Sequence, residues 1–181
     1  GKVKVYTINV TRMISSNPFL KGFKINGEEY EFFEENKLDY EIALPYQLNA
    51  VLVEAIKSNE LQTVTGDGVQ ILLHNEAEAR ILVVSEDGLN NKLYTIKFKK
   101  EKTTLLNKAT IKEENTTIKF EPDKFIYEIE ISPLHHTLTL DILPYYEGVN
   151  ITIEGNKYIG ENSKTITITS ELEGEPTSTY T

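Results

Sequence analysis

Apolar and polar residues alternate along most of this 181-residue chain, in short stretches separated by turn residues. Alternation with a period of two turns one set of side chains toward a core and the other toward solvent, as in a half-buried β-strand. The pattern therefore predicts an all-β protein of short antiparallel strands. The predicted strands are 2–12, 19–25, 30–33, 40–44, 48–57, 61–65, 69–74, 80–84, 93–100, 105–111, 127–131, 137–142, 149–153 and 165–168.

One of these stretches also has helical spacing. Leu48, Val51, Leu52, Ala55 and Ile56 follow the i, i+3, i+4, i+7, i+8 pattern of an amphipathic helix. The matching stretch later in the chain, 137–142, alternates and is rich in threonine, which is poor helix material. Two copies of one fold share their elements, so we predict a strand in both places.

A twelve-residue pattern occurs twice in this sequence. Residues 33–44 recur as residues 120–131, each a polar turn followed by a strand that alternates from Tyr40 or Tyr127. A repeat of this length is a whole domain, longer than the units of most solenoids and propellers. The chain is therefore predicted to contain two domains of similar design.

Three Tyr-Thr pairs, which begin at Tyr6, Tyr94 and Tyr180, set the predicted boundaries. Residues 1–12 are interpreted as the last strand of a preceding repeat, with Gly1 as a tag remnant. The first repeat is predicted to span 13–100. The second repeat, 101–181, is predicted to lack most of its last strand, and 100–104 is a short polar linker between the two.

The segment 2–12 thus duplicates the strand that begins at Tyr180. An unpaired sheet edge readily accepts a strand from another chain. We therefore expect residues 2–12 to complete the second repeat of a neighbouring molecule, head to tail.

Charge and composition exclude several classes of partner and chemistry. The formal net charge is −9, and Arg12 and Arg80 are the only arginines, so neither nucleic acid nor an anionic lipid surface is an expected partner. No apolar run approaches the roughly 20 residues of a spanning helix, so no membrane insertion is expected. The absence of cysteine excludes disulfides, thiol catalysis and thiolate metal sites.

The order of these motifs resembles the bacterial cadherin-like β-sandwich repeat, which has an immunoglobulin-like architecture. The matching stretches of the first repeat are 20–25 (Leu-Lys-Gly-Phe-Lys-Ile), 33–35 (Phe-Glu-Glu), 40–45 (Tyr-Glu-Ile-Ala-Leu-Pro), 85–88 (Ser-Glu-Asp-Gly) and 94–100 (Tyr-Thr-Ile-Lys-Phe-Lys-Lys). Those of the second are 106–111, 120–122 and 127–131. The resemblance implies two tandem antiparallel sandwiches from a larger secreted or wall-attached bacterial protein. The acidic calcium motifs of animal cadherins do not occur in the sequence, so the resemblance implies no calcium site here.

Most candidate sites have a simpler explanation as turns. His135 and His136 are adjacent and would point to opposite faces of a strand, so they cannot chelate one metal together, and the position of His74 relative to them is open. The Glu pairs and Asp-Gly pairs suit solvated turns better than acid–base catalysis or calcium binding. The Glu pairs are 34–35 and 113–114, and the Asp-Gly pairs are 67–68 and 87–88. No catalytic residue, cofactor or metal is therefore predicted.

The best candidate for a ligand surface is the aromatic pair Tyr145 and Tyr146, which follows Pro144. Aromatic faces stack on sugars and on partner proteins, and loops often carry function. The chain contains no tryptophan, which weakens a carbohydrate-binding interpretation.

Two functional hypotheses follow from the sequence. The first is a non-enzymatic spacer or adhesion module of an extracellular or surface-attached bacterial protein, whose ligand is a protein or a glycan. The alternative is a carbohydrate-binding accessory module of a secreted glycan-active enzyme, with Tyr145 and Tyr146 as its ligand surface.

Overall fold

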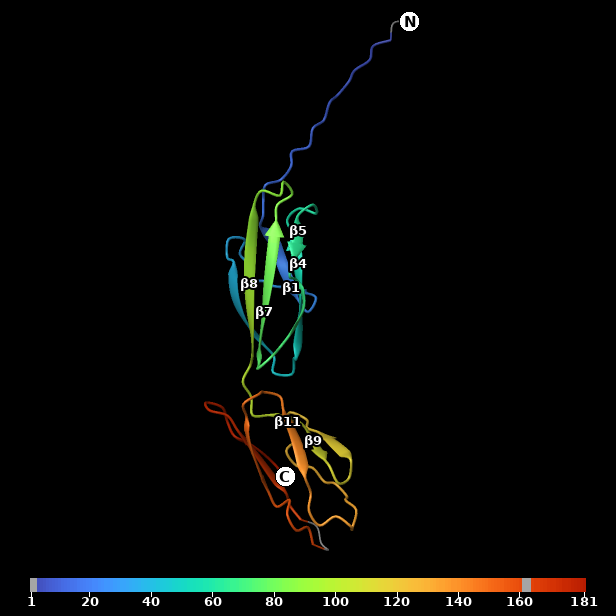
Figure 1. The fold of residues 1–181 in the computed structure, drawn as a ribbon, viewed down its shortest axis with the longest axis vertical. Coiled ribbons are helices and arrows are strands. Elements are labelled where there is room, and N and C mark those ends of the chain that lie inside the picture. Colours follow the sequence, from blue (N-terminus) through green and yellow to red (C-terminus); the bar gives the residue numbers. More distant parts are fainter. Residues whose placement is uncertain (1–2, 161–163) are drawn as a thin grey trace. The chain divides into compact units, whose positions relative to one another are not determined.

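The computed structural model describes residues 3–160 and 164–181 (Figure 1). Every regular element in this part of the chain is a β-strand, and the strands form several antiparallel sheets. The all-β class is confirmed, and the sheets are consistent with β-sandwich architecture.

The chain divides into two compact units. The first consists of the described residues up to Ile42 together with Ala50–Ile71 and Ala77–Lys97. The second consists of Ala43–Asn49, Leu72–Glu76 and the described residues from Phe98 onward.

The strands up to Lys100 form two four-stranded sheets. One has the order β2 (Glu28–Glu29), β1 (Leu20–Ile25), β4 (Ala50–Lys57) and β6 (Gly68–Ile71). The other has the order β3 (Asp39–Leu44), β8 (Asn91–Lys100), β7 (Glu76–Val84) and β5 (Thr63–Thr65). The buried core residues on these strands include Phe23, Val53, Ile81, Ile96 and Phe98, all fully covered.

The strands after Lys100 form two three-stranded sheets. One has the order β10 (Thr116–Lys119), β9 (Leu106–Ile111) and β11 (Leu140–Pro144). The other has the order β12 (Asn150–Glu154), β13 (Thr167–Glu171) and β14 (Ser178–Tyr180). A core of Leu106, Ala109, Phe120, Ile168 and Tyr180 packs between them.

The stretch with helical spacing is a strand, as predicted. In β4, Val51 and Val53 are buried whereas Leu52 and Glu54 are exposed, which is the two-residue period of a sheet. The hairpin that precedes it also follows the prediction, because Asn26 and Gly27 adopt φ values of 51° and 90° at the turn between β1 and β2.

The predicted strand at 30–33 is wrong. The structure places only the two-residue β2 before this stretch, and Tyr30 instead stacks on Phe23 with 5.0 Å between ring centroids. Phe33 packs edge-on against the same ring at 5.7 Å. The aromatic side chains therefore cover the core from a turn, and alternation is not needed to bury them.

Two further predicted strands, 2–12 and 127–131, are also absent from the described residues, and they share a cause. Neither the described part of the first, 3–12, nor 127–131 is assigned to a strand, although both alternate. Alternation specifies which side chains suit a sheet, whereas a strand also needs a hydrogen-bonded neighbour. Within residues 3–160 and 164–181, neither stretch belongs to a hydrogen-bonded sheet.

Two pairs of tyrosines repeat the same hydrogen bonds in the two halves of the chain. The Tyr94 hydroxyl accepts from the Leu20 amide at 3.2 Å, and the Tyr180 hydroxyl accepts from the Leu106 amide at 3.0 Å. Each bond ties the last strand of a repeat to the start of its first strand.

The second pair closes the duplicated turns. The Glu34 amide donates to the Tyr40 hydroxyl at 3.0 Å, and the Glu121 amide donates to the Tyr127 hydroxyl at 2.8 Å. The sequence repeat is thus reproduced as a repeat of specific contacts, in addition to a repeat of strands.

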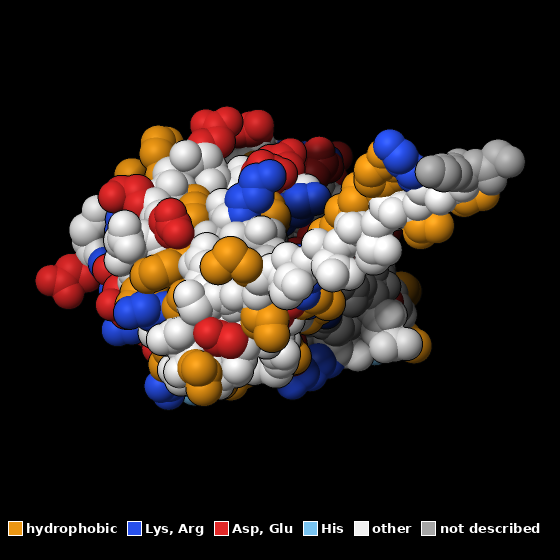
Figure 2. Space-filling model, turned by 90° about the horizontal axis from the view of Figure 1, so that it is seen from above, with side chains coloured by type: hydrophobic (Ala, Val, Ile, Leu, Met, Phe, Trp, Pro, Cys, Tyr) orange, Lys and Arg blue, Asp and Glu red, His pale blue; other side chains and the backbone are white. Residues whose placement is uncertain are grey.

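The N-terminal segment is exposed, and polar interactions hold its C-terminal end, at Arg12, to the loop between β7 and β8. Arg12 forms an ion pair with Glu86, whose carboxylate also accepts from the Ser15 amide at 3.1 Å and from Asn59 at 2.8 Å. Before this anchor the apolar side chains stand in solvent along the segment (Figure 2). They include Val3, Val5, Ile8 and Val10.

Tyr94→Phe should lower the free energy of unfolding of the first repeat by about 1–3 kcal/mol. The Tyr94 side chain is fully buried, and its hydroxyl also donates to the Glu35 carbonyl at 2.9 Å, so the change leaves two backbone groups without a partner. Urea unfolding measures the change. Tyr158→Phe removes the same hydroxyl from an exposed ring and should have no effect, so equal effects of the two changes would contradict this account.

Acid should release the N-terminal anchor. Hydrogen bonds from Arg12, first, and from the Ser15 amide lower the pKa of Glu86 from 4.5 to about 2. A folded-state pKa below the unfolded one contributes stability that is present above pH 4.5 and is lost as the pH falls toward 2. Glu86→Gln should therefore lower stability at pH 7 but not at pH 2.

Urea unfolding of parent and variant across this range tests the expectation. Exposed Glu60, in the neighbouring turn, gives the matched control, because Glu60→Gln should leave the pH profile unchanged. A parallel decline of the parent and Glu86→Gln curves would show that Glu86 is not the titrating group.

Candidate functional site

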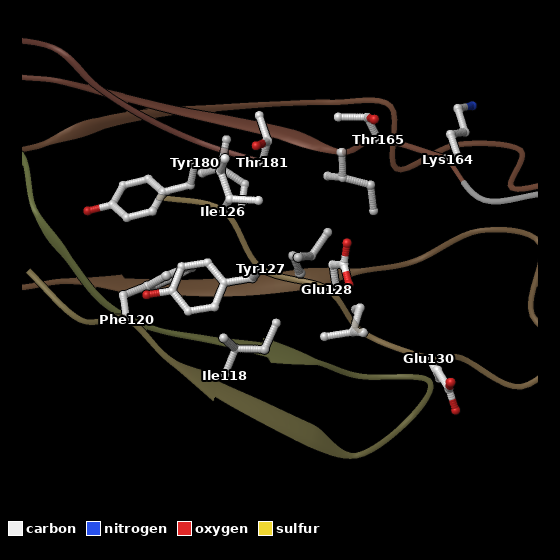
Figure 3. Close-up of a pocket in the computed structure, with 14 residues that line it drawn as sticks. Ile118, Phe120, Ile126, Tyr127, Glu128, Glu130, Lys164, Thr165, Tyr180 and Thr181 are labelled. Carbon is white, nitrogen blue, oxygen red and sulfur yellow. The ribbon is translucent and has the colours of Figure 1, made fainter. Parts of the chain in front are cut away.

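The second compact unit contains an open groove of about 730 Å³. Its long walls are two stretches that lie far apart in sequence, 126–130 and 164–168 (Figure 3). The groove is therefore a slot between two extended backbones.

Aromatic rings close one end of this slot (Figure 3). The Phe120 ring lies 4.7 Å from that of Tyr180 and 5.2 Å from that of Tyr127, measured between centroids. Burial raises the pKa of Tyr180, as expected for a phenol that faces a core. Beyond the rings, Ile118, Leu140 and Ile166 add an aliphatic lining.

Hydrogen bonds at this end show which kind of pairing the slot supports. The Thr181 amide donates to the Phe125 carbonyl at 2.8 Å, and the Tyr127 amide donates to the Thr181 carbonyl at 2.8 Å. In a parallel pair of strands, one residue forms hydrogen bonds to two residues of the neighbouring strand that are two positions apart, as Thr181 does here. The ladder thus begins at Thr181 and points along 127–131.

The opposite wall continues an antiparallel ladder. Ile168 pairs with Tyr180 in the sheet of β13 and β14. Residue numbers rise along one strand of an antiparallel pair as they fall along the other. A strand that continued beyond Thr181 would therefore place its next core-facing residues opposite Ile166 and then Lys164. A strand in the slot would therefore pair parallel with one wall and antiparallel with the other.

The first repeat has a strand in the matching place. There β8 lies between β3 and β7, and the Thr95 amide donates to the Leu38 carbonyl at 2.7 Å, just as Thr181 bonds to Phe125. Ile96 and Phe98 of β8 are fully buried. The groove thus occupies the place that β8 fills in the first repeat beyond Thr95.

Three exposed charged side chains line the slot away from the aromatic rings. Glu128 and Glu130 lie on one wall and Lys164 on the other (Figure 3). The Lys164 Nζ donates to the carbonyls of Lys157 and Tyr158, at 2.7 and 2.9 Å. An apolar floor with open backbone walls suits an extended peptide, whose main chain provides affinity and whose alternate side chains provide specificity.

The predicted ligand residues Tyr145 and Tyr146 do not line this groove. Both are half-buried after β11, within the second compact unit. The Tyr145 ring lies edge-on to that of Tyr46 with 5.2 Å between centroids, and its carbonyl accepts from the Lys100 Nζ at 3.1 Å. One face of the predicted aromatic pair therefore already has a protein neighbour, and ligand binding by it stays a prediction.

Glu113 and Glu114 lie in a turn, as predicted, but they are half-buried and hydrogen-bonded to another loop, so they are not simply solvated. Hydrogen bonds, chiefly from the Thr139 hydroxyl, lower the pKa of Glu113, and hydrogen bonds, chiefly from His135, lower that of Glu114. Acid–base catalysis by two carboxyls needs pKa values that are moved apart, and here both move down. The pair fixes loops: Glu114 accepts from the Ser132 amide at 2.7 Å.

The other candidate residues also have structural partners. His135 contacts Glu114 at 2.8 Å, whereas the neighbouring His136 Nδ1 lies 3.2 Å from the Ile159 carbonyl, so the two histidines diverge. Within residues 3–160 and 164–181, no three His, Asp or Glu side chains gather in a way that could hold a metal ion.

The turn at Asp87 and Gly88 is stabilised by hydrogen bonds within the turn. Asp87 accepts from the Ser85 hydroxyl at 2.5 Å and from the Leu89 amide at 3.0 Å, which is the expected capping of its own turn. The sequence did not single out the groove residues, although the partial third Tyr-Thr copy indicated an unpaired edge near them.

Comparison with known proteins adds no family to this description: no family model, curated protein or solved structure matches the chain. Among the described residues there is no helix with the length and apolar character needed to cross a membrane.

Proposed function

We propose that this chain is a non-catalytic module of two tandem, immunoglobulin- or cadherin-like β-sandwiches. Its role would be to space or present neighbouring parts of a larger secreted or surface-attached bacterial protein, or to mediate adhesion through strand edges and loops. The bacterial and extracellular assignments rest on the sequence resemblance.

The observation that carries this proposal is the duplication of contacts. Tyr94 and Tyr180 make the same bond to the first strand of their repeats, and Tyr40 and Tyr127 make the same bond to the duplicated turn. The same internal contacts occur in both halves of the chain. Such repetition of one structural unit is expected of a tandem repeat protein.

The carbohydrate-binding alternative rests on Tyr145 and Tyr146. The Tyr145 ring packs against Tyr46, so Tyr146 is the residue of the pair that a sugar would be expected to use. A glycan-array signal that is lost in Tyr146→Ala would favour this alternative. Binding to a surface protein, with no glycan signal, would favour adhesion.

Pulling the chain from its two ends should give two separate unfolding events. Each repeat releases about 75–80 residues, so each event should add about 25–29 nm of contour length before the folded length is subtracted. The second repeat should open at the lower force, because its sheet contains the open slot. Single-molecule force spectroscopy measures both values, and one event for the whole chain would contradict a tandem module.

A further inference from the structure

The exposed N-terminal segment has the sequence of the strand that would fill the groove. Aligned on the Tyr-Thr pairs, Ile8 and Val10 match Ile96 and Phe98, the buried residues of β8. In the described chain Ile8 and Val10 are 85% and 87% exposed. Apolar side chains that are covered in one copy of the strand thus stand in solvent in another.

We infer that residues Ile8–Thr11 of one molecule occupy the groove of a second copy of this chain, as a strand that continues from Thr181. The inference depends on the groove and the repeated segment, and it holds whether or not the chain acts as a spacer.

The two ladders set the register of this strand. Ile8 would follow Thr181 and lie opposite Ile166, and Val10 would lie opposite Lys164. On the other wall the Asn9 amide would donate to the Tyr127 carbonyl, two residues beyond the existing bond from Thr181 to Phe125. Ile8 and Val10 then face the core, and Asn9 and Thr11 face solvent.

Charge favours the same occupant. The segment 3–12 contains Lys4 and Arg12 and no acidic residue, in a chain whose net charge is −9. The parallel wall of the groove carries exposed Glu128 and Glu130. The donor segment therefore brings no negative charge to a wall that carries two carboxylates.

The position of the anchor also fits. Arg12 is held at Glu86, so residues 3–11 precede the anchored part and can pair elsewhere without disturbing the hairpin. In the first repeat Lys100 ends β8, and β9 starts six positions later at Leu106. Arg12 is followed by β1 at Leu20 after a linker of similar length.

The test is the oligomeric state of the whole chain by sedimentation velocity over a range of concentrations. The parent should form concentration-dependent oligomers. The double variant Ile8→Asp/Val10→Asp should weaken association about a hundredfold or more, because two apolar side chains are no longer available for burial. Val3→Asp/Val5→Asp, which changes equally exposed residues outside Ile8–Thr11, is the matched control and should associate like the parent.

Mixing two variants makes the test directional. Ile8→Asp/Val10→Asp keeps an intact groove, and Ile166→Lys keeps an intact donor segment. Each alone should be a monomer, and their mixture should form a one-to-one dimer, because only the mixture combines an intact donor segment with an intact groove. Growth of the parent beyond a dimer then distinguishes a head-to-tail contact from a reciprocal exchange. Circular dichroism checks that the Ile166→Lys variant retains its sheets.

A third variant keeps the inference falsifiable if Ile166→Lys does not fold. Appending Ile-Asn-Val-Thr-Arg after Thr181 supplies the strand within the same chain, and it should abolish association and raise the unfolding temperature of the second repeat. This variant also measures the competition that any segment following Thr181 in a longer chain would impose. A parent that is monomeric at all concentrations, or an appended variant that associates like the parent, would overturn the inference.

Discussion

The strand that comes last in the first repeat lies in the middle of its sheet, and the rest of the repeat depends on it. β8 is hydrogen-bonded between β3 and β7, and its Tyr94, Ile96 and Phe98 are fully buried. A central strand satisfies backbone groups on two neighbours at once and covers the core from one face. Its neighbour β3 exists as a strand because β8 lies beside it.

In the second repeat, the open groove lies at the position that β8 fills beyond Thr95 in the first. Residues 127–131 have the same alternation as β3 but are not a strand, and Tyr127 is only half-buried where Tyr40 is 3% exposed. The bond from Tyr180 to the first strand is nevertheless kept, because it precedes the slot. The core is therefore organised at one end and open at the other.

The sequence predicted the strands well where alternation and turn residues agreed, as in β1, β4 and the hairpin at Asn26 and Gly27. It failed at 30–33, where a stack of rings on Phe23 buries aromatic side chains without a strand. It also failed at 127–131, because side-chain preference says nothing about whether a hydrogen-bonding neighbour exists. The unpaired edge could be predicted from the partial Tyr-Thr copy. The groove lining could not, since its walls are 126–130 and 164–168, which only the fold brings together.

The two-residue period that predicted the strands also explains why a strand in the groove would have one register. Ile8 and Val10 are separated by Asn9. A shift of the pairing by one residue would therefore turn the side chains of Asn9 and Thr11 toward the core and leave both aliphatic side chains in solvent. Burying a polar side chain without a partner costs more than the slip could recover elsewhere. The ladder that starts at Thr181 fixes the first pair of backbone bonds, and every later pair follows from it. An exposed apolar segment is usually a risk of unspecific aggregation. Here its alternation, its lack of acidic side chains and the geometry of the slot favour a single pairing.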